Sequence, residues 1–312
     1  MYFKEQNILL CAIDHGFSTI KTPHFIFDNG VEEIGTEATL EAKTMECKDT
    51  FYKIGEGRLP MKDTKIEDED YLLLTYAAIA KEIEYYGLPS EDGIRVVVAA
   101  GLPFTRFGEE KLSFSNYLKR GVVTFVYEGK SYFIEIEEVL LYPQCYAAVA
   151  DRILAFKKKT LIVDIGSWTI DIMPVINKSP DESNCITIQR GLITCMRAIN
   201  EKCVRLYNGE IDESELQNLM RYGADYAKDE EYYQVAKDEI EAFVEKVYNS
   251  IREYGYNLKT TPIIFVGGGA VVMKNFGNYD EKNISYILDI KANARGYEEL
   301  ADIGLRNMRK KA

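Results

Sequence analysis

The sequence has few of the residues that build metal and disulfide sites. It contains six cysteines and two histidines among 312 residues, and no two cysteines are spaced as Cys-x-x-Cys. A structural zinc site takes four Cys or His ligands at close spacing, so this composition argues against one. Several of the cysteines lie in apolar runs, where a thiol acts as a small hydrophobic side chain. In a chain of this length their even number is weak support for disulfides.

Long apolar runs are also missing from the sequence. No stretch approaches the roughly 18 consecutive apolar residues that a membrane-spanning helix needs. The opening residues, MYFKEQNILL, show no basic region followed by an apolar segment and a small-residue cleavage site. These absences predict a cytoplasmic protein that does not use a membrane as a partner.

Positive charge is scarce relative to negative charge. The formal net charge is −12, and the one basic cluster late in the chain, RNMRKK, reads best as the C-terminal end of a last helix. Sequence-independent DNA binding needs a basic face that neutralises phosphates. The composition therefore argues against direct binding of nucleic acid.

Hydrophobic residues make up 46% of the chain, which is ample for the cores of two domains of ordinary size. Bounded apolar runs predict buried strands at residues 8–14, 93–103, 161–165, 169–176 and 262–266, and alternation predicts a hairpin around Glu128-Gly129-Lys130. Helices are predicted at residues 67–87, 105–120, 143–156, 192–207, 212–221, 229–254 and from about 292, with Pro143 starting the third. Asp212 and Glu215 are expected to form a capping pair. The alternation of strands and helices indicates an α/β fold.

One local pattern occurs twice, about half the chain apart. CAIDHGFSTIKT (Cys11 to Thr22) and LIVDIGSWTIDI (Leu161 to Ile172) each place Asp-x-Gly and small hydroxyl residues between two apolar runs. A single Asp-x-Gly after a strand is usually only a turn. Two related copies favour a shared function, with one copy supplied by each domain.

The residue types in these turns suit a polyphosphate and its metal. Gly16 and Gly166 let the backbone turn tightly and approach an anion, and backbone N–H groups with the hydroxyls of nearby Ser and Thr residues can donate to phosphate oxygens. Lys21 adds a positive charge. Because a carboxylate beside a phosphate implies a cation between them, Asp14 and Asp164 are predicted to hold Mg²⁺ through its water ligands.

A third glycine-rich motif follows the predicted strand PIIFV. Gly267, Gly268 and Gly269, with Ala270, would give a backbone that can lie flat against a base or a ribose. The nucleotide-binding residues predicted from the three motifs are Gly16, Phe17, Ser18, Thr19, Lys21, Gly166, Ser167, Trp168, Thr169, Gly267, Gly268, Gly269 and Ala270.

With these motifs, the chain resembles the superfamily of actin, heat-shock chaperone and sugar-kinase ATPases, and within it the ParM/StbA-type actins of plasmid segregation. The two Asp-x-Gly turns look like its two phosphate motifs, FVGGGA (Phe265 to Ala270) looks like its adenosine motif, and AAGLPFTRFGEEK and NARGYEEL resemble ParM-type segments. LYPQCYAAVA (Leu141 to Ala150) is similar to the segment that joins the domains, and there the resemblance gives Gln144 the role of orienting the attacking water.

The resemblance implies two ribonuclease-H-like domains flanking a nucleotide cleft. The expected boundaries are 1–152 for the first domain, with a C-terminal helix at about 290–312 packing back on it, and 153–289 for the second. Gln144, Asp14 and Asp164 would be the catalytic residues, with Mg²⁺ as cofactor and ATP, or GTP, as substrate.

The resemblance also implies how the protein works. Subunits would add head to tail into a filament, hydrolysis would loosen it, and a DNA-binding adaptor of the ParR type would connect it to plasmid DNA. A small-molecule kinase of the same fold, or a cell-shape or division actin, is the alternative. The nucleotide prediction depends on the residues, whereas the filament prediction depends on the resemblance alone.

Overall fold

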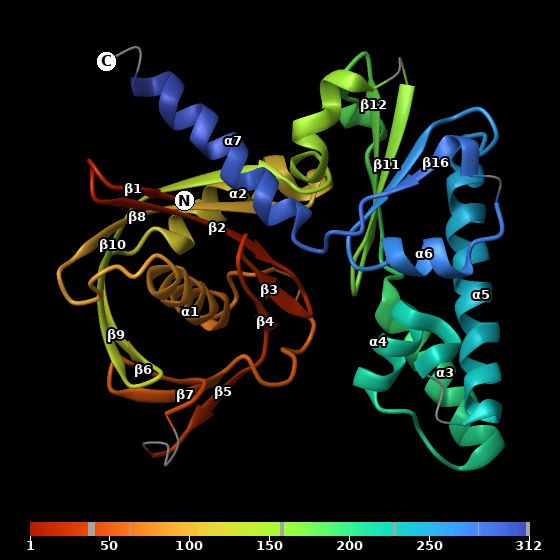
Figure 1. The fold of residues 1–312 in the computed structure, drawn as a ribbon, viewed down its shortest axis with the longest axis horizontal. Coiled ribbons are helices and arrows are strands. Elements are labelled where there is room, and N and C mark those ends of the chain that lie inside the picture. The colour runs from red at the N-terminus through yellow and green to blue at the C-terminus, as the bar shows by residue number, and fades with distance from the viewer. Residues whose placement is uncertain (37–40, 63, 157–158, 227–228, 280, 310–312) are drawn as a thin grey trace. The chain divides into compact units, whose positions relative to one another are not determined.

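The computed structural model (Figure 1) describes residues 1–36, 41–62, 64–156, 159–226, 229–279 and 281–309. The chain divides into two compact units: unit 1 is Met1–Asp151 with Lys291–Ala312, and unit 2 is Arg152–Ile290. Residues 310–312, with which the last predicted helix was expected to end, lie outside the described residues.

Unit 1 is built on a ten-stranded sheet with the order β4-β3-β2-β8-β10-β9-β6-β7-β5, and β1 pairs with β2 (Figure 1). The strands are β1 Tyr2–Phe3, β2 Ile8–His15, β3 Thr19–Lys21, β4 Ile26–Asp28, β5 Val31–Ile34, β6 Thr44–Cys47, β7 Thr50–Ile54, β8 Ile94–Leu102, β9 Gly121–Tyr127 and β10 Lys130–Pro143. Strands β2, β8 and β10 are parallel, whereas β9 and β10 form the predicted antiparallel hairpin.

The central strands of unit 1 are apolar on both faces because helices cover both. Leu9, Cys11 and Ile13 of β2 share a core with helix α1 (Asp70–Tyr85), and the alternate residues Leu10 and Ala12 pack with helix α7 (Ala292–Arg309). Because successive strand residues point to opposite faces and both faces are buried, the sequence of β2 is a continuous apolar run through Ile13.

Helix α7 approaches the sheet closely. A Cβ on Gly101 of β8 would lie 1.9 Å from the hydroxyl oxygen of Tyr297, and one on Gly296 would lie 1.9 Å from the carbonyl oxygen of Ala147. Both glycines therefore make room for the NARGYEEL segment at the start of α7. The remaining helix of unit 1, α2, spans Phe104–Leu118.

Unit 2 has a six-stranded sheet in the order β13-β12-β11-β15-β16, with β14 paired to β12. Its strands are β11 Lys159–Ile165, β12 Ile170–Ile176, β13 Ser179–Pro180, β14 Ile186–Ile188, β15 Ile263–Val266 and β16 Ile284–Tyr286. Its helices are α3 Leu192–Tyr207, α4 Glu213–Tyr222, α5 Glu230–Glu253 and α6 Ala270–Phe276. Apolar residues of α3, α4 and α5 pack with β11 and β15 in one core.

The predicted helix over residues 143–156 is wrong in type and start. Strand β10 continues through Pro143, which pairs with Leu102 of β8, and Cys145 then has a left-handed φ of 63°. The helical residues that follow, Ala147–Ala155, form a 3₁₀ helix. Gln144 therefore lies at the exit of a strand, where its N–H donates to the carbonyl of Leu102 at 2.9 Å.

The capping pair predicted at Asp212 is also not formed, because the Asp212 side chain makes no cap hydrogen bond to α4. The capping aspartate of unit 2 is Asp229, whose Oδ1 accepts the N–H groups of Glu231 at 2.9 Å and Tyr232 at 3.1 Å. Asp229 has the extended backbone, φ −139° and ψ 129°, that a helix N-cap residue favours.

Candidate functional site

The first Asp-x-Gly turn joins β2 to β3. Asp14 pairs with Lys21 across the two strands, and the Gly16 N–H donates to the Asp14 carbonyl at 3.0 Å. A Cβ on Gly16 would lie 2.6 Å from the carbonyl oxygen of Thr19. The turn is therefore tight enough to exclude any side chain at this position.

The carboxylate of Asp14 is almost fully buried and is held from two sides. Lys21 Nζ lies 3.2 Å from Oδ2, and the Gln144 side-chain amide donates to Oδ1 at 3.3 Å. These residues come from β2, β3 and the segment after β10. Tertiary structure thus brings together three residues that the sequence predicted for one site.

Asn29 is a residue of this turn that the sequence did not single out. Asn29 N–H donates to the Ser18 carbonyl at 3.0 Å, and its side-chain amide donates to the Gly16 carbonyl at 3.4 Å. Its Oδ1 accepts the N–H of Leu59 at 3.3 Å. The sequence had marked Asn29-Gly30 only as a turn pair, and nothing local indicated that the buried amide would hold the backbone of the phosphate-type turn.

His15 follows Asp14 but belongs to the core. Its Nε2 lies 2.8 Å from Thr75 Oγ1, which itself donates to the Tyr71 carbonyl at 2.7 Å, so Nε2 carries the proton and donates to Thr75. Burial lowers the pKa of His15 well below its usual value, and the nearby charge of Lys65 lowers it further. The imidazole is therefore neutral and anchors β2 to α1.

The second Asp-x-Gly turn joins β11 to β12 with the same strand register as the first turn, but its glycine N–H has a different acceptor. Asp164 pairs with Asp171 across the strands, and the Gly166 N–H donates to the Thr169 carbonyl at 2.9 Å. The start of α3 is docked on this turn, because the N–H of Ile193 donates to the Ser167 carbonyl at 2.9 Å.

Hydroxyl groups near the second turn are directed at Asp171. The Thr169 hydroxyl donates to Oδ2 at 3.0 Å and the Thr187 hydroxyl donates to Oδ1 at 2.5 Å. The Thr169 hydroxyl has one proton, and it is donated to Asp171. A phosphate oxygen could accept that proton only if the hydrogen bond to Asp171 were broken. The ring centre of Trp168, the residue before Thr169, lies 5.0 Å from the Arg197 guanidinium carbon.

The glycine triplet lies against the second turn. Strand β15 is parallel to β11, with Val266 paired to Asp164, and the Gly269 N–H donates to the Ile165 carbonyl at 2.9 Å. Gly267 has a φ of 78°, and a Cβ on it would lie 2.1 Å from Asp164 Oδ1. Unit 2 therefore assembles two of the three predicted motifs, while the first turn, Lys21 and Gln144 come together in unit 1.

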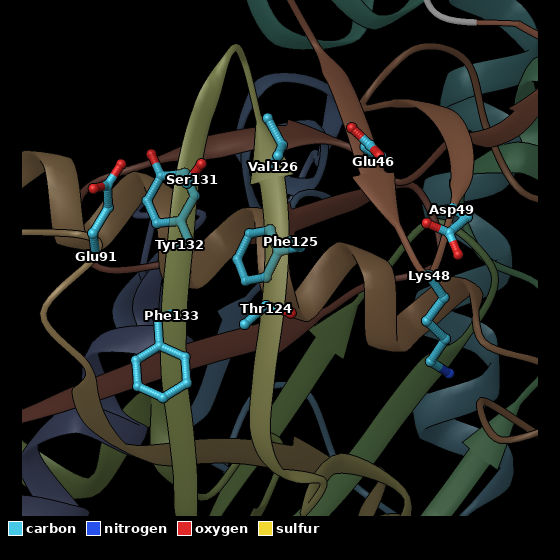
Figure 2. Close-up of a pocket in the computed structure, with 10 residues that line it drawn as sticks. All are labelled: Glu46, Lys48, Asp49, Glu91, Thr124, Phe125, Val126, Ser131, Tyr132 and Phe133. Carbon is cyan, nitrogen blue, oxygen red and sulfur yellow. The ribbon is translucent and has the colours of Figure 1, made fainter.

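The structure has two pockets away from the predicted site residues, one in each unit. One, of about 360 Å³, lies on the β9–β10 hairpin and the β6–β7 connection of unit 1, and Figure 2 shows Glu46, Lys48 and Tyr132 among its lining residues. The other, of about 380 Å³, lies between β12, β14, α3 and α5 and includes Arg190, Glu239 and Lys246. Neither is lined by a residue predicted for the site.

Comparison with known families gives a match in each unit. Residues 39–146 match the family described as actin like proteins N terminal domain, and residues 162–276 match archaeal actin homologue MreB-like, C-terminal. The chain is an actin-like protein. The predicted superfamily and the predicted α/β fold with two domains of the actin-like type are both confirmed.

Solved structures with this fold come from archaea and bacteria. The archaeal actin homologue Ta0583 matches with a TM-score of 0.78 at 18% identity, covering 95% of this chain and 99% of its own. Its complex with ADP has a TM-score of 0.75 at 17% identity, over 95% and 99% of the two chains. A 15-stranded ParM filament from Clostridium botulinum has a TM-score of 0.73 at 21% identity, over 94% and 99%. No curated protein matches the chain by sequence.

Two features are absent from the described residues, a membrane-spanning helix and a cluster of metal ligands. No described helix is both long enough and apolar enough to cross a bilayer. In the same part of the chain, no three His, Cys, Asp or Glu side chains are grouped as a metal site would need. A magnesium ion that arrives with a nucleotide does not need such a group, because phosphates and waters fill most of its coordination sphere.

Proposed function

We propose that the protein binds Mg²⁺ with ATP, or GTP, through its two Asp-x-Gly turns and its glycine triplet, and hydrolyses the γ-phosphate. The observation that carries the proposal is the hydrogen bond from Gln144 to Asp14. A side-chain amide has one donor group and one acceptor oxygen. With the donor held by the Asp14 carboxylate, the Gln144 carbonyl oxygen remains to accept a hydrogen bond from an attacking water.

The donor set also suits magnesium. Mg²⁺ prefers oxygen ligands and retains several waters, so one or two carboxylates are enough to position it beside phosphates. Asp14 and Asp164 would hold it, through those waters, and the ion would offset the charge of the phosphates. Lys21 already neutralises part of the Asp14 charge, so the turn does not present an uncompensated carboxylate to an anion.

We further propose that the protein polymerises head to tail in its nucleotide-bound state and that the filament segregates plasmid DNA. The resemblance to the ParM fold supports this, and the net charge of −12 supports a separate DNA-binding adaptor of the ParR type. A contact between different surfaces of identical subunits gives an open filament when its rotation does not close.

Light scattering, electron microscopy and phosphate release together test the proposal. The purified protein with Mg²⁺ and ATP or GTP should scatter light, form elongated polymers and release phosphate, and ADP should support less assembly. Asp14→Asn and Gln144→Ala should slow phosphate release by about 100-fold or more, the range typical of a lost catalytic group. Asp28→Asn, an exposed aspartate on β4, is the matched control and should behave as wild type.

The same assays separate the alternatives. Phosphate transfer to a small acceptor without polymers would identify a kinase of the same fold. Absence of nucleotide binding by the folded wild-type protein would contradict the proposal altogether.

A further inference from the structure

The first turn lies beside a buried lysine that the sequence did not single out. Lys65 belongs to the segment between β7 and α1, and only 5% of its surface is exposed. Its Nζ lies 5.4 Å from the ring centre of Phe17, 5.8 Å from that of Tyr71 and 5.9 Å from that of Phe114. One face of this aromatic cage is therefore the phosphate-type turn itself.

Lys65 differs from Lys62 in having no carboxylate partner in the part of the chain that the structure describes. Lys62, three residues earlier, forms ion pairs with both Asp68 and Asp70. Among the described residues no carboxylate lies within ion-pair distance of Lys65 Nζ, although acidic residues occupy every position from 67 to 70. A buried ammonium without a counter-ion is costly, and three aromatic faces offset only part of that cost.

The charged groups around Lys65 leave its charge uncompensated. Asp14 of β2 and Glu110 of α2 favour the charged form, whereas Lys21 of β3 and Arg106 of α2 oppose it. Each of the two acids is already paired, Asp14 with Lys21 at 3.2 Å and Glu110 with Arg106 at 2.5 Å. The imidazole of His15 is neutral, so it supplies no charge. Burial, the largest cause, lowers the pKa of Lys65 to about 8.

We infer that Lys65 is a second phosphate-binding cation of the first turn, acting with Lys21 on the nucleotide that the turn binds. This inference rests on the proposed function, because it assigns a further residue to the same site. A phosphate group near Phe17 would supply the negative charge that the protein does not. The lysine thus destabilises the free protein and is stabilised by the ligand, which is the behaviour expected of a binding residue rather than a structural one.

Nucleotide affinity and thermal stability, measured on the same variants, test the inference. Lys65→Met keeps the length of the side chain and removes its charge. It should weaken binding of MgATP and MgADP by about tenfold or more, the range for a charge-assisted hydrogen bond, and leave binding of adenosine within about twofold of wild type. The melting temperature of the ligand-free protein should stay the same or rise. Lys65→Arg should retain part of the affinity.

Lys81→Met is the matched control. Lys81 also lies near two aromatic rings of unit 1, at 5.9 Å from Phe27 and 5.2 Å from Tyr127, but its Nζ has the carboxylate of Glu128 at 3.8 Å. It should not change MgATP affinity. Lys65→Gln provides a second neutral variant in case Lys65→Met does not fold.

Two outcomes would overturn the inference while leaving the proposed function intact. One is MgATP affinity of both neutral variants within about twofold of wild type. The other is an equal loss of MgATP and adenosine binding with a lower melting temperature, which would mark Lys65 as structural. Failure of the folded wild-type protein to bind MgATP would instead overturn the proposed function, and this inference with it.

Discussion

Gly267 and Asp164 are in such close contact that a Cβ on the glycine would lie 2.1 Å from the carboxylate oxygen Oδ1. The two residues belong to motifs about a hundred positions apart, and the parallel pairing of β11 with β15 brings them together. The glycine-rich motif therefore shapes the second aspartate turn directly. Its first glycine is required by packing within unit 2, whatever the third motif contacts in a nucleotide.

Gly267→Ala is expected to destabilise unit 2. The new methyl group would displace Asp164, and the left-handed φ of 78° adds about 1–2 kcal/mol of backbone strain for a residue with a Cβ. The free energy of unfolding should fall by about 2 kcal/mol or more in denaturant titration, and affinity for MgATP should fall with it.

Gly268→Ala is the control for this change. Among the described residues, chain neighbours aside, the one atom within 4 Å of a Cβ at Gly268 is Leu192 Cδ1, at 4.0 Å, and the backbone is not left-handed. Its stability should stay within about 0.5 kcal/mol of wild type. Equal stability of the two variants would show that the Gly267–Asp164 contact is not close.

The two Asp-x-Gly turns are expected to differ in their tolerance of alanine. A Cβ on Gly16 would lie 2.6 Å from the Thr19 carbonyl oxygen, whereas one on Gly166 would lie 3.4 Å from the Thr169 carbonyl oxygen, an ordinary contact. Gly16→Ala should lower the free energy of unfolding by about 1–3 kcal/mol, and Gly166→Ala by less than about 0.5 kcal/mol. Chemical denaturation of both variants measures the difference, and a larger effect at Gly166 would contradict it.

Helix capping in unit 2 offers a matched pair of aspartates. Asp229 accepts two backbone N–H groups at the start of α5, while Asp212 makes no such bond at the start of α4. Asp229→Ala should destabilise the protein by about 1 kcal/mol, and Asp212→Ala by a few tenths at most. Thermal melts of the two variants compare them under identical conditions. Similar losses at both positions would mean that charge near the helix end, rather than the hydrogen bonds, is what matters.

Because of Lys65, the stability of the ligand-free protein should vary with pH in the alkaline range. Its pKa is lowered from 10.5 to about 8 on folding, so between these values the unfolded chain binds more protons than the folded one, and stability rises with pH. The destabilisation, about 3 kcal/mol at most, is fully present below pH 8 and disappears toward pH 10.5. Denaturant titrations at pH 7 and pH 10 measure the free energy of unfolding of wild type and Lys65→Met. The difference between the two proteins should be smaller at pH 10 than at pH 7. An equal difference in the free energy of unfolding at the two pH values would contradict a lowered pKa of Lys65.

The sequence was most informative where structure is local. Helix α3 begins and ends where periodicity placed it, at residues 192 and 207, and the hairpin around Gly129 follows from the alternation on its two arms. Residues 143–156 show the limit of such patterns. A helix starting at Pro143 was predicted there, but the parallel pairing of β10 with β8 extends the strand through Pro143, and a 3₁₀ helix follows it.

The amino-acid sequence by itself determined the α/β class, the repeated turns and the residues they contain, because strand, turn and helix signals lie within a few neighbouring positions. The resemblance had assigned Gln144 to the site, but tertiary structure alone showed which atoms meet there, and it alone added Asn29 and Lys65 to the first turn. Asn29 holds the backbone of Gly16 and Ser18, and Gln144 reaches Asp14 from 130 positions away. Lys65 is buried against Phe17 with no counter-ion among the described residues. Hydrogen bonds and burial of this kind depend on chain segments that meet only when the sheet has formed, so no local pattern encodes them.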